Sequence, residues 1–171
     1  MSNDAPTGPA KPFLQSQHFS RRLGKVKRDA PAETAGGLLL DADGRMLLGL
    51  RARHKRVAPG LWDIVGGRVE QNEVVKDALV REIVEELDVR PTRFRLLASL
   101  VEQSDGAAQC VHHVYSITEW EGGNPRNACD EHSEVRWFTI GEIRSLSNKT
   151  PSDFDALYSL ARDGCRSDGD P

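Results

Sequence analysis

The sequence predicts a single-domain α/β protein, an α/β/α sandwich in which helices pack on a mixed β-sheet. The chain has 171 residues, enough for one well-packed core and too few for two comfortable domains. Short apolar or alternating runs separated by turn residues are typical of strands. Among them, residues 73–87 repeat apolar side chains at helical spacing.

The two ends of the chain differ in composition from its middle. Residues 1–12 are rich in Pro, Ala, Ser and Asn without an apolar period, and residues 18–28 carry a basic run. We therefore expect a flexible N-terminal arm over residues 1–30 and a folded domain over residues 31–163. The polar residues 164–171 are expected to form a disordered tail.

Strands are predicted in the first half of the domain. Residues 33–40 and 45–50 flank an Asp-rich turn that ends in Gly44, which predicts a β-hairpin. Residues 62–65 form a further short strand, and this strand runs directly into a pair of glycines. Glycines at such a place let the backbone approach a ligand closely.

The second half of the domain carries further strand and helix signals. A polar turn over residues 103–106 separates two strand-like runs, and the later run alternates apolar with polar side chains. Thr139 followed by Glu142 is a capping box, which marks a helix start. We predict strands over residues 94–101, 109–120 and 135–138, an irregular segment over 119–129, and helices over 139–146 and 151–162.

Composition excludes several classes of protein. The net charge of −3 and the 29% of charged residues give no global basic field for nucleic acid. Cys110, Cys129 and Cys165 are far apart and form no CxxC pair, so buried or incidental thiols in a reducing cytoplasm are expected. No apolar run has the roughly 18 residues that a membrane helix needs, and no signal-peptide stretch is seen.

The predicted helix over residues 73–87 has an acidic side. Glu82, Glu85 and Glu86 are neighbours on a helix surface because they are spaced i, i+3 and i+4. The opposite side would be the core stripe of Leu79, Val80, Ile83, Val84 and Leu87. Carboxylates so close together repel one another, and a hard divalent cation such as Mg²⁺ would balance their charge.

This segment resembles the Nudix box of the Nudix hydrolases. Six fixed identities at roughly 1 in 15 each give a chance match of about 10⁻⁷ per starting position, so the motif is specific. Asp88 stands where the motif has a glycine, and Asn72 replaces a looser glycine preference; both residue types tolerate left-handed backbone. The matching positions are Gly67, Glu73, Arg81, Glu82, Ile83, Glu85, Glu86 and Val89.

The resemblance implies roles for individual residues. Glu82, Glu85, Glu86 and the carbonyl of Gly66 would hold the metal, while Arg81 would organise Glu73 and Glu82. Trp120, Gly122 and Pro125, followed by an acid and a Trp-Phe pair, resemble the second half of MutT-like members. A loop carboxylate there reaches the metal site, with Glu131 as the best match and Glu134 as the second. Catalytic roles are thus expected for Glu82, Glu131, Glu85 and Arg81, and a structural role for Gly67 and Glu73.

A basic loop follows the predicted hairpin. Arg51, Arg53 and Lys55 would form a phosphate clamp opposite the acidic helix, because guanidinium forks fit phosphate oxygens. A surface loop with no ligand is the alternative. Phe94, Tyr115 and Trp120 are candidates for stacking on a base, although strand aromatics usually belong to the core.

The resemblance implies a Nudix-type sandwich and a MutT-like pyrophosphohydrolase for nucleoside diphosphates linked to another group, using Mg²⁺ or Mn²⁺. A nucleoside triphosphate cleaved to monophosphate and pyrophosphate is the favoured substrate. ADP-ribose, nucleotide sugars and dinucleoside polyphosphates are alternatives. An isopentenyl diphosphate isomerase would need a cysteine near residues 59–63, where the sequence has none; a non-catalytic nucleotide sensor would be expected to lack box carboxylates. The expected partner is a small nucleotide, with no membrane or nucleic acid, and the oligomeric state stays open between monomer and homodimer.

Overall fold

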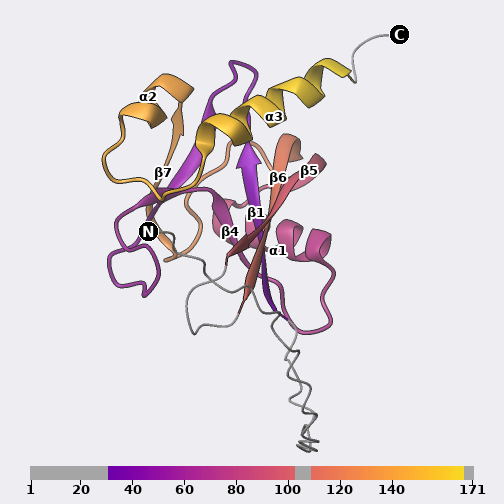
Figure 1. Ribbon diagram of the computed structural model, residues 1–171, viewed down its shortest axis with the longest axis vertical. Coiled ribbons are helices and arrows are strands. Elements are labelled where there is room, and N and C mark those ends of the chain that lie inside the picture. Colours follow the sequence, from indigo (N-terminus) through magenta and orange to yellow (C-terminus); the bar gives the residue numbers. More distant parts are fainter. Residues whose placement is uncertain (1–30, 103–108, 168–171) are drawn as a thin grey trace, which may run out of the picture.

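Two β-sheets form the centre of the protein, and three helices pack against them (Figure 1). The structure is a computed structural model that describes residues 31–102 and 109–167. The predicted arm over residues 1–30 and the predicted turn over 103–106 lie outside the described residues. Of the predicted tail, residues 168–171 also lie outside them, whereas the last helix continues to Ser167.

The larger sheet has four strands in the order β4-β1-β6-β5. β1 (Ala32–Leu39) pairs with β4 (Val65–Arg68) in antiparallel and with β6 (Cys110–Glu121) in parallel orientation. β5 (Arg90–Glu102) pairs antiparallel with β6 and closes the order. This is the predicted mixed sheet, and the antiparallel β5–β6 pair is the one that the polar turn predicts.

The smaller sheet is antiparallel and has the order β3-β2-β7. Its central strand is β2 (Met46–Arg51), flanked by β3 (Trp62–Asp63) and β7 (His132–Phe138). Residues 62–65, predicted as one strand, divide at Ile64 between the two sheets. The chain therefore passes from one sheet to the other just before the glycine pair.

The predicted hairpin over residues 33–50 is wrong, although both of its strands and its turn exist. Asp41 accepts hydrogen bonds from Asp43 N–H and Arg45 N–H, and Gly44 has a φ of 74°. Beyond a single bridge between Leu40 and Met46, β1 and β2 separate into different sheets. Apolar and polar residues do not alternate in these two leucine-rich strands, as expected for strands that are buried on both faces. Such a pattern does not indicate which strand is the pairing neighbour.

The three helices lie close to where the sequence predicts them. α1 is Val75–Leu87 and α2 is Ile140–Ser145, which begins with the predicted capping box of Thr139 and Glu142. α3 is Phe154–Ser167. Within residues 31–102 and 109–167, no helix is long and apolar enough to cross a membrane.

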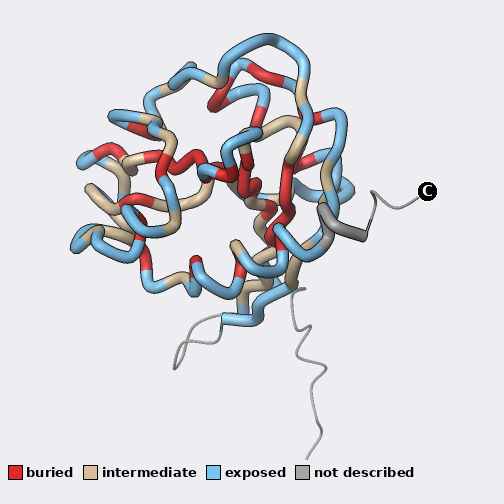
Figure 2. Tube along the Cα trace, turned by 90° about the horizontal axis from the view of Figure 1, so that it is seen from above, coloured by how far each residue is buried: buried red, intermediate tan, exposed pale blue. Residues whose placement is uncertain are grey.

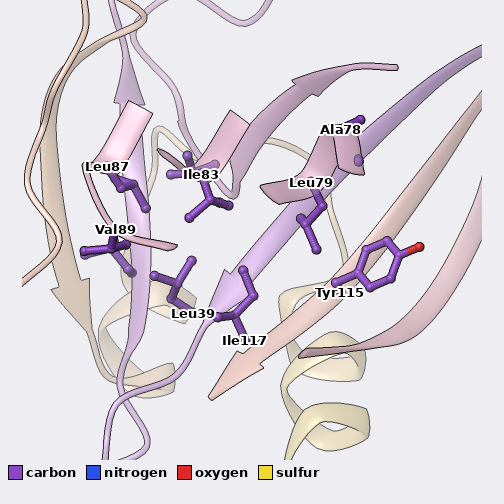
Figure 3. Close-up of a cluster of buried hydrophobic side chains, with 11 residues drawn as sticks. Leu39, Ala78, Leu79, Ile83, Leu87, Val89, Tyr115 and Ile117 are labelled. Atoms are coloured by element: carbon purple, nitrogen blue, oxygen red, sulfur yellow. The ribbon is translucent and has the colours of Figure 1, made fainter. Parts of the chain in front are cut away.

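One apolar cluster joins α1 to the larger sheet. Figure 3 shows Leu79, Ile83 and Leu87 of α1 directed toward Leu39 and Ile117 on the strands. All five side chains are fully buried. Each such side chain contributes about 1.5–3 kcal/mol, so this cluster fixes α1 against the sheet. Val84, predicted to belong to this stripe, is 39% exposed, and the stripe includes Glu86 instead.

A second apolar cluster lies under α2 and α3. Leu38 of β1 packs there with Phe138 of β7, Ile143 of α2 and Phe154 of α3. Since Leu38 and its neighbour Leu39 belong to different clusters, the strands separate α1 from the other two helices. In Figure 2 the buried residues, coloured red, gather toward the centre of the molecule. The arrangement is the predicted α/β/α sandwich.

Candidate active site

The acidic side of α1 borders a cavity of about 510 Å³. β4, the end of β2 and the loop before β7 form the other walls. Five acidic and two basic side chains line it, so its formal charge favours a cation. The lining residues are Arg51, Gly66, Gly67, Arg68, Glu82, Glu85, Glu86, Cys129, Asp130 and Glu131.

The three carboxylates of α1 differ in their depth. Their side chains are 59% exposed at Glu85, 13% at Glu82 and 4% at Glu86. The Gly66 N–H donates a hydrogen bond to Glu86 Oε2 at 3.2 Å, which ties the end of α1 to β4. The predicted side-by-side arrangement is present, and it runs from solvent into the interior.

Arg81 connects the two ends of the motif. Its guanidinium donates to both carboxylate oxygens of Glu73 at 2.8 and 2.9 Å and to Glu82 Oε1 at 2.7 Å. It also donates to the Arg68 carbonyl at 2.9 Å. The Arg81 guanidinium holds the pKa of Glu73 down to about 2. The contacts are those that the resemblance implies for an organising residue.

Gly67 allows this arrangement for a steric reason. A Cβ added at this position would overlap the carboxylate of Glu82. Any larger residue would therefore push Glu82 away from β4. This explains in physical terms why the motif has a glycine at this position.

The departures from the motif adopt the backbone that a glycine would provide. Asn72 has a φ of 67° and Asp88 a φ of 57°, both in the left-handed region. Asp88 is the C-cap of α1, and its N–H donates to the Val84 carbonyl. The expectation that these substitutions are conformationally compatible is confirmed.

The loop before β7 is held against the end of α1 by backbone hydrogen bonds. Arg126 N–H donates to the Leu87 carbonyl at 3.0 Å, and Ala128 N–H donates to the Glu86 carbonyl at 2.9 Å. The last carbonyls of a helix lack partners within the helix, so the loop satisfies them. This contact carries residues 129–132 to the cavity.

Glu131 lies between two basic residues at the opposite wall. It accepts from Arg51 Nη1 at 2.8 Å and from Lys55 Nζ at 2.6 Å. The hydrogen bond from Lys55 lowers the pKa of Glu131, and the same bond raises the pKa of Lys55. The structure thus brings Arg51, Lys55 and Glu131 together beside the acidic helix.

Lys55 contacts Glu131 but is not itself among the lining residues of the cavity. Two other predicted residues, both in the described part of the chain, have no such contact with the lining. Arg53 is exposed and is not among the lining residues. Glu134 is exposed on β7, where it pairs with Leu50. Inclusion of Arg53 in the clamp is therefore not supported, because Arg51 is the last residue of β2 and Arg53 lies in the turn beyond it. Of the two loop acids, the cavity holds Glu131.

Burial and like charge act on the inner carboxylates. Burial, with additional repulsion from Glu82 and Glu131, raises the pKa of Glu86 to about 8. Burial also raises the pKa of Glu82. A divalent cation would stabilise the ionised forms of both groups, and carboxylate oxygens are the donors that Mg²⁺ prefers. The residues present therefore fit a hard divalent ion.

Four residues near this cavity have no functional role predicted from the sequence. Arg68 and Asp130 are among its lining residues, and so is Cys129. His132 is buried beside Glu86, with Nδ1 at 3.9 Å from Glu86 Oε2. Cys129, expected to be a buried or incidental thiol, lines the same cavity as Arg51. The spacing Cys129-x-x-His132 was the available signal.

The candidate stacking aromatics belong to the core. Tyr115 is buried in the α1 cluster with Phe94 in edge contact, and Trp120 stacks on Trp137 at 6.0 Å between ring centroids. His112 and His113 make cross-strand contacts on the larger sheet. None of these side chains is among the lining residues of the cavity.

The family follows from comparison with known proteins. The family model described as the NUDIX domain matches residues 30–160. The chain belongs to the Nudix family. The match includes the whole Nudix box and the loop that carries Glu131, and the chain is accordingly a Nudix pyrophosphohydrolase.

Relatives of this Nudix chain include enzymes and solved structures. The nucleoside triphosphatase NudI of Salmonella typhimurium is 34% identical over 114 residues, which cover 61% of this chain and 80% of that protein. The crystal structure of a MutT NUDIX hydrolase from Burkholderia pseudomallei superposes with a TM-score of 0.65 at 30% identity, covering 75% of this chain and 97% of that one. The NUDIX domain of Shewanella oneidensis NrtR, solved with ADP ribose, shares the fold at a TM-score of 0.63 and 21% identity, covering 80% and 90%.

Proposed function

We propose that this Nudix hydrolase cleaves a nucleoside triphosphate to the monophosphate and pyrophosphate with the help of Mg²⁺. The observation that carries the proposal is the cavity in which the acidic face of α1 meets Arg51 and Arg68. Such a site suits a polyanion that arrives with divalent cations. The 34% identity to a nucleoside triphosphatase supports the substrate class.

The metal ligands in this proposal are Glu82, Glu85 and Glu86, with the carbonyl of Gly66 and with Glu131 from the opposite wall. When bound, Mg²⁺ would neutralise phosphate oxygens and lower the pKa of the attacking water, and Mn²⁺ is the alternative ion. Arg81 keeps Glu82 in position through its hydrogen bonds to Glu82 and Glu73.

The phosphate-binding role falls to Arg51, with Lys55 and Arg68 beside it. Arg51 Nη1 donates a hydrogen bond to Glu131 Oε2 at 2.8 Å. A phosphate group would compete with this carboxylate for the guanidinium, because carboxylates and phosphates both accept paired hydrogen bonds from Arg. Binding of substrate and release of Glu131 toward the metal would then occur together.

Two carboxylates are candidates for taking the proton from water. A general base works best when its pKa lies near the working pH. Burial raises the pKa of Glu82, whereas Lys55 lowers that of Glu131. These opposite shifts favour Glu82 as the base and a supporting charge role for Glu131 and Glu85.

The test is a substrate panel with Mg²⁺, in which products are identified by mass. The expected result is pyrophosphate and a monophosphate from one or more nucleoside triphosphates, including oxidised ones. If products formed from ADP-ribose, nucleotide sugars or dinucleoside polyphosphates and from no triphosphate, the proposed substrate would be wrong and the hydrolysed class would take its place. Turnover of none of these compounds with Mg²⁺ or Mn²⁺ would contradict the proposal.

Replacing Glu86 by Gln should lower kcat at least about 10²-fold, the scale seen when one charge-stabilising group is removed. The fold should persist, because Gln has the shape of the protonated acid. Asp77→Asn is the matched control, since Asp77 is exposed on the same helix, and its kcat should stay within about twofold. Activity of Glu86→Gln within tenfold of the parent would remove Glu86 from the mechanism.

Further proposals rest on the sequence. We infer that the domain extends over residues 31–163 and that the protein works in the cytoplasm, as the scattered unpaired cysteines suggest. Its expected partner is a small nucleotide, with neither nucleic acid nor membrane.

A further inference from the structure

At the inner end of the cavity, Glu86 and Cys129 lie beside the buried His132, and this group offers donor atoms of a different chemical type from the outer carboxylates. Glu86, Cys129 and His132 each offer one ligand atom, and these three atoms all lie within 4.8 Å of one another. A carboxylate oxygen, a thiol sulfur and an imidazole nitrogen form a mixed donor set. Hard ions such as Mg²⁺ favour oxygen alone, whereas Zn²⁺ and similar ions favour sulfur and nitrogen.

His132 gives the independent sign of a ligand. Its Nδ1 is buried and has no hydrogen-bond partner among the described residues, and the side chain is 1% exposed. Leaving such an atom without a partner costs about 1–3 kcal/mol, so buried polar atoms without partners call for an explanation. This nitrogen lies 3.9 Å from Glu86 Oε2, beyond hydrogen-bonding distance.

The surrounding backbone holds the three donors in place. The Ala128 N–H bond to the Glu86 carbonyl positions Cys129 at the end of α1. The ring of His132 packs on Gly49, where an added Cβ would overlap it. Asn127 Nδ2 donates to the His132 carbonyl at 2.8 Å. Cys129 Sγ also accepts a hydrogen bond from the Glu131 N–H at 3.4 Å, and Glu86 Oε2 accepts one from the Gly66 N–H at 3.2 Å. Of the three ligand atoms, His132 Nδ1 is the one without a partner among the described residues.

The spacing suits a small tetrahedral ion. Zn²⁺ lies about 2.0–2.3 Å from nitrogen, oxygen and sulfur ligands, which places the ligand atoms about 3.3–3.8 Å apart. The present separations of 3.9 Å and up to 4.8 Å need contractions of up to about 1.5 Å to reach this range. Three protein ligands would leave the fourth position of a tetrahedral ion free for water or another ligand, as in catalytic rather than structural zinc sites.

We propose that Glu86, Cys129 and His132 form a binding site for a thiophilic divalent cation of the Zn²⁺ class. The site shares Glu86 with the carboxylate cage of α1. Occupation would therefore withdraw Glu86 from a hard-ion site, so that Zn²⁺ inhibits the Mg²⁺-dependent enzyme at low concentration. This second statement rests on the proposed function, whereas the binding site itself does not.

The test of binding uses Co²⁺ as a spectroscopic substitute for Zn²⁺ in the full chain, with a phosphine as the reductant. A thiolate-to-cobalt charge-transfer band in the near ultraviolet should appear with one equivalent and should persist in excess Mg²⁺. Zn²⁺ should abolish it by displacement. Absence of the band, or its loss on adding Mg²⁺ alone, would overturn the proposal.

Matched variants assign the band to residues. Cys129→Ser should abolish it, whereas Cys110→Ser and Cys165→Ser should keep it. His132→Gln should weaken Co²⁺ binding on the order of 100-fold, since changes even outside the ligand shell cost about 10- to 100-fold. A band that survives Cys129→Ser would overturn the assignment.

A measurement on the parent protein covers the case in which Cys129→Ser does not fold. Zn²⁺ should slow alkylation of Cys129 more than about tenfold, as followed by peptide mass, and leave the rate at Cys110 unchanged. Equal rates with and without Zn²⁺ would overturn the proposal.

The activity measurement separates this proposal from the proposed function. Zn²⁺ should inhibit hydrolysis in the presence of excess Mg²⁺, and a chelator should restore it. A cobalt band without hydrolysis of any substrate would leave the site standing and contradict the proposed function. Hydrolysis without a cobalt band would contradict the metal site and leave the proposed function standing.

Discussion

Arg51 and Arg53 show how two arginines separated by a single residue acquire different environments. Arg51 lies at the end of β2, lines the cavity and pairs with Glu131 at 2.8 Å. Arg53 is exposed and outside the lining. The pair offers two substitutions with the same change in charge and different expected effects.

Arg51→Ala should lower kcat/KM about 10- to 100-fold, the scale of one lost charge-assisted hydrogen bond to phosphate. Arg53→Ala should change it less than about twofold, because its side chain does not reach the cavity. Steady-state kinetics on the best substrate of the panel give both values. Equal losses in the two variants would indicate that Arg51 acts through general charge and not through contact.

At the scale of the element, the end of α1 determines where the loop before β7 attaches. Asp88 adopts the left-handed conformation at a φ of 57°, and its carboxylate pairs with Arg126. Both side chains are more than half exposed, so the ion pair adds little stability. The backbone conformation is therefore the main constraint at this position.

Asp88→Ala should be less stable than Asp88→Gly by about 1 kcal/mol, because a Cβ is disfavoured in left-handed backbone and Gly has none. Both variants lose the contact with Arg126, so their difference isolates the backbone effect. Urea unfolding of the two proteins measures it. If Asp88→Ala were as stable as Asp88→Gly, the left-handed end of α1 would be in doubt.

At the scale of the whole molecule, local signals predicted the elements and long-range contacts decided their partners. The i, i+3, i+4 spacing predicted the carboxylate face of α1, and Thr139 with Glu142 predicted the start of α2. The separation of β1 from β2 could not be predicted, because Leu38 and Leu39 are buried on opposite faces and their pattern fits several neighbours.

The position of Cys129 and His132 beside Glu86 could not be predicted from the sequence for a related reason. Cys129 reaches Glu86 because backbone groups of Ala128 and Arg126 satisfy the last carbonyls of α1. Backbone hydrogen bonds of this kind do not depend on side-chain identity, so they cannot be predicted from a pattern of residue types. The motif identified the outer carboxylates, and the fold brought the thiol and the imidazole to them.

Stability of the metal-free protein should fall as the pH rises from about 6.5 to about 8. The pKa of Glu86 is raised from 4.5 to about 8, so its contribution is full below pH 4.5 and is lost up to about pH 8. Burial lowers the pKa of His132 from 6.5 to about 4. The titration of His132 therefore makes the folded protein more stable as the pH rises toward 6.5, and it adds no pH dependence above 6.5.

Between about pH 6.5 and about pH 8, Glu86 is the one of these two groups whose protonation differs between the folded and the unfolded state. The free energy of unfolding should therefore fall by up to about 1.4 kcal/mol per pH unit. Glu86→Gln should remove this slope because Gln does not ionise, whereas Asp77→Asn should keep it. Urea unfolding in a chelator at several pH values measures the slopes. Adding Mg²⁺ should also flatten the slope, since a bound cation stabilises the ionised carboxylate in the folded state. Identical slopes for the parent and Glu86→Gln would show that the Glu86 carboxyl does not hold its proton in the folded, metal-free protein.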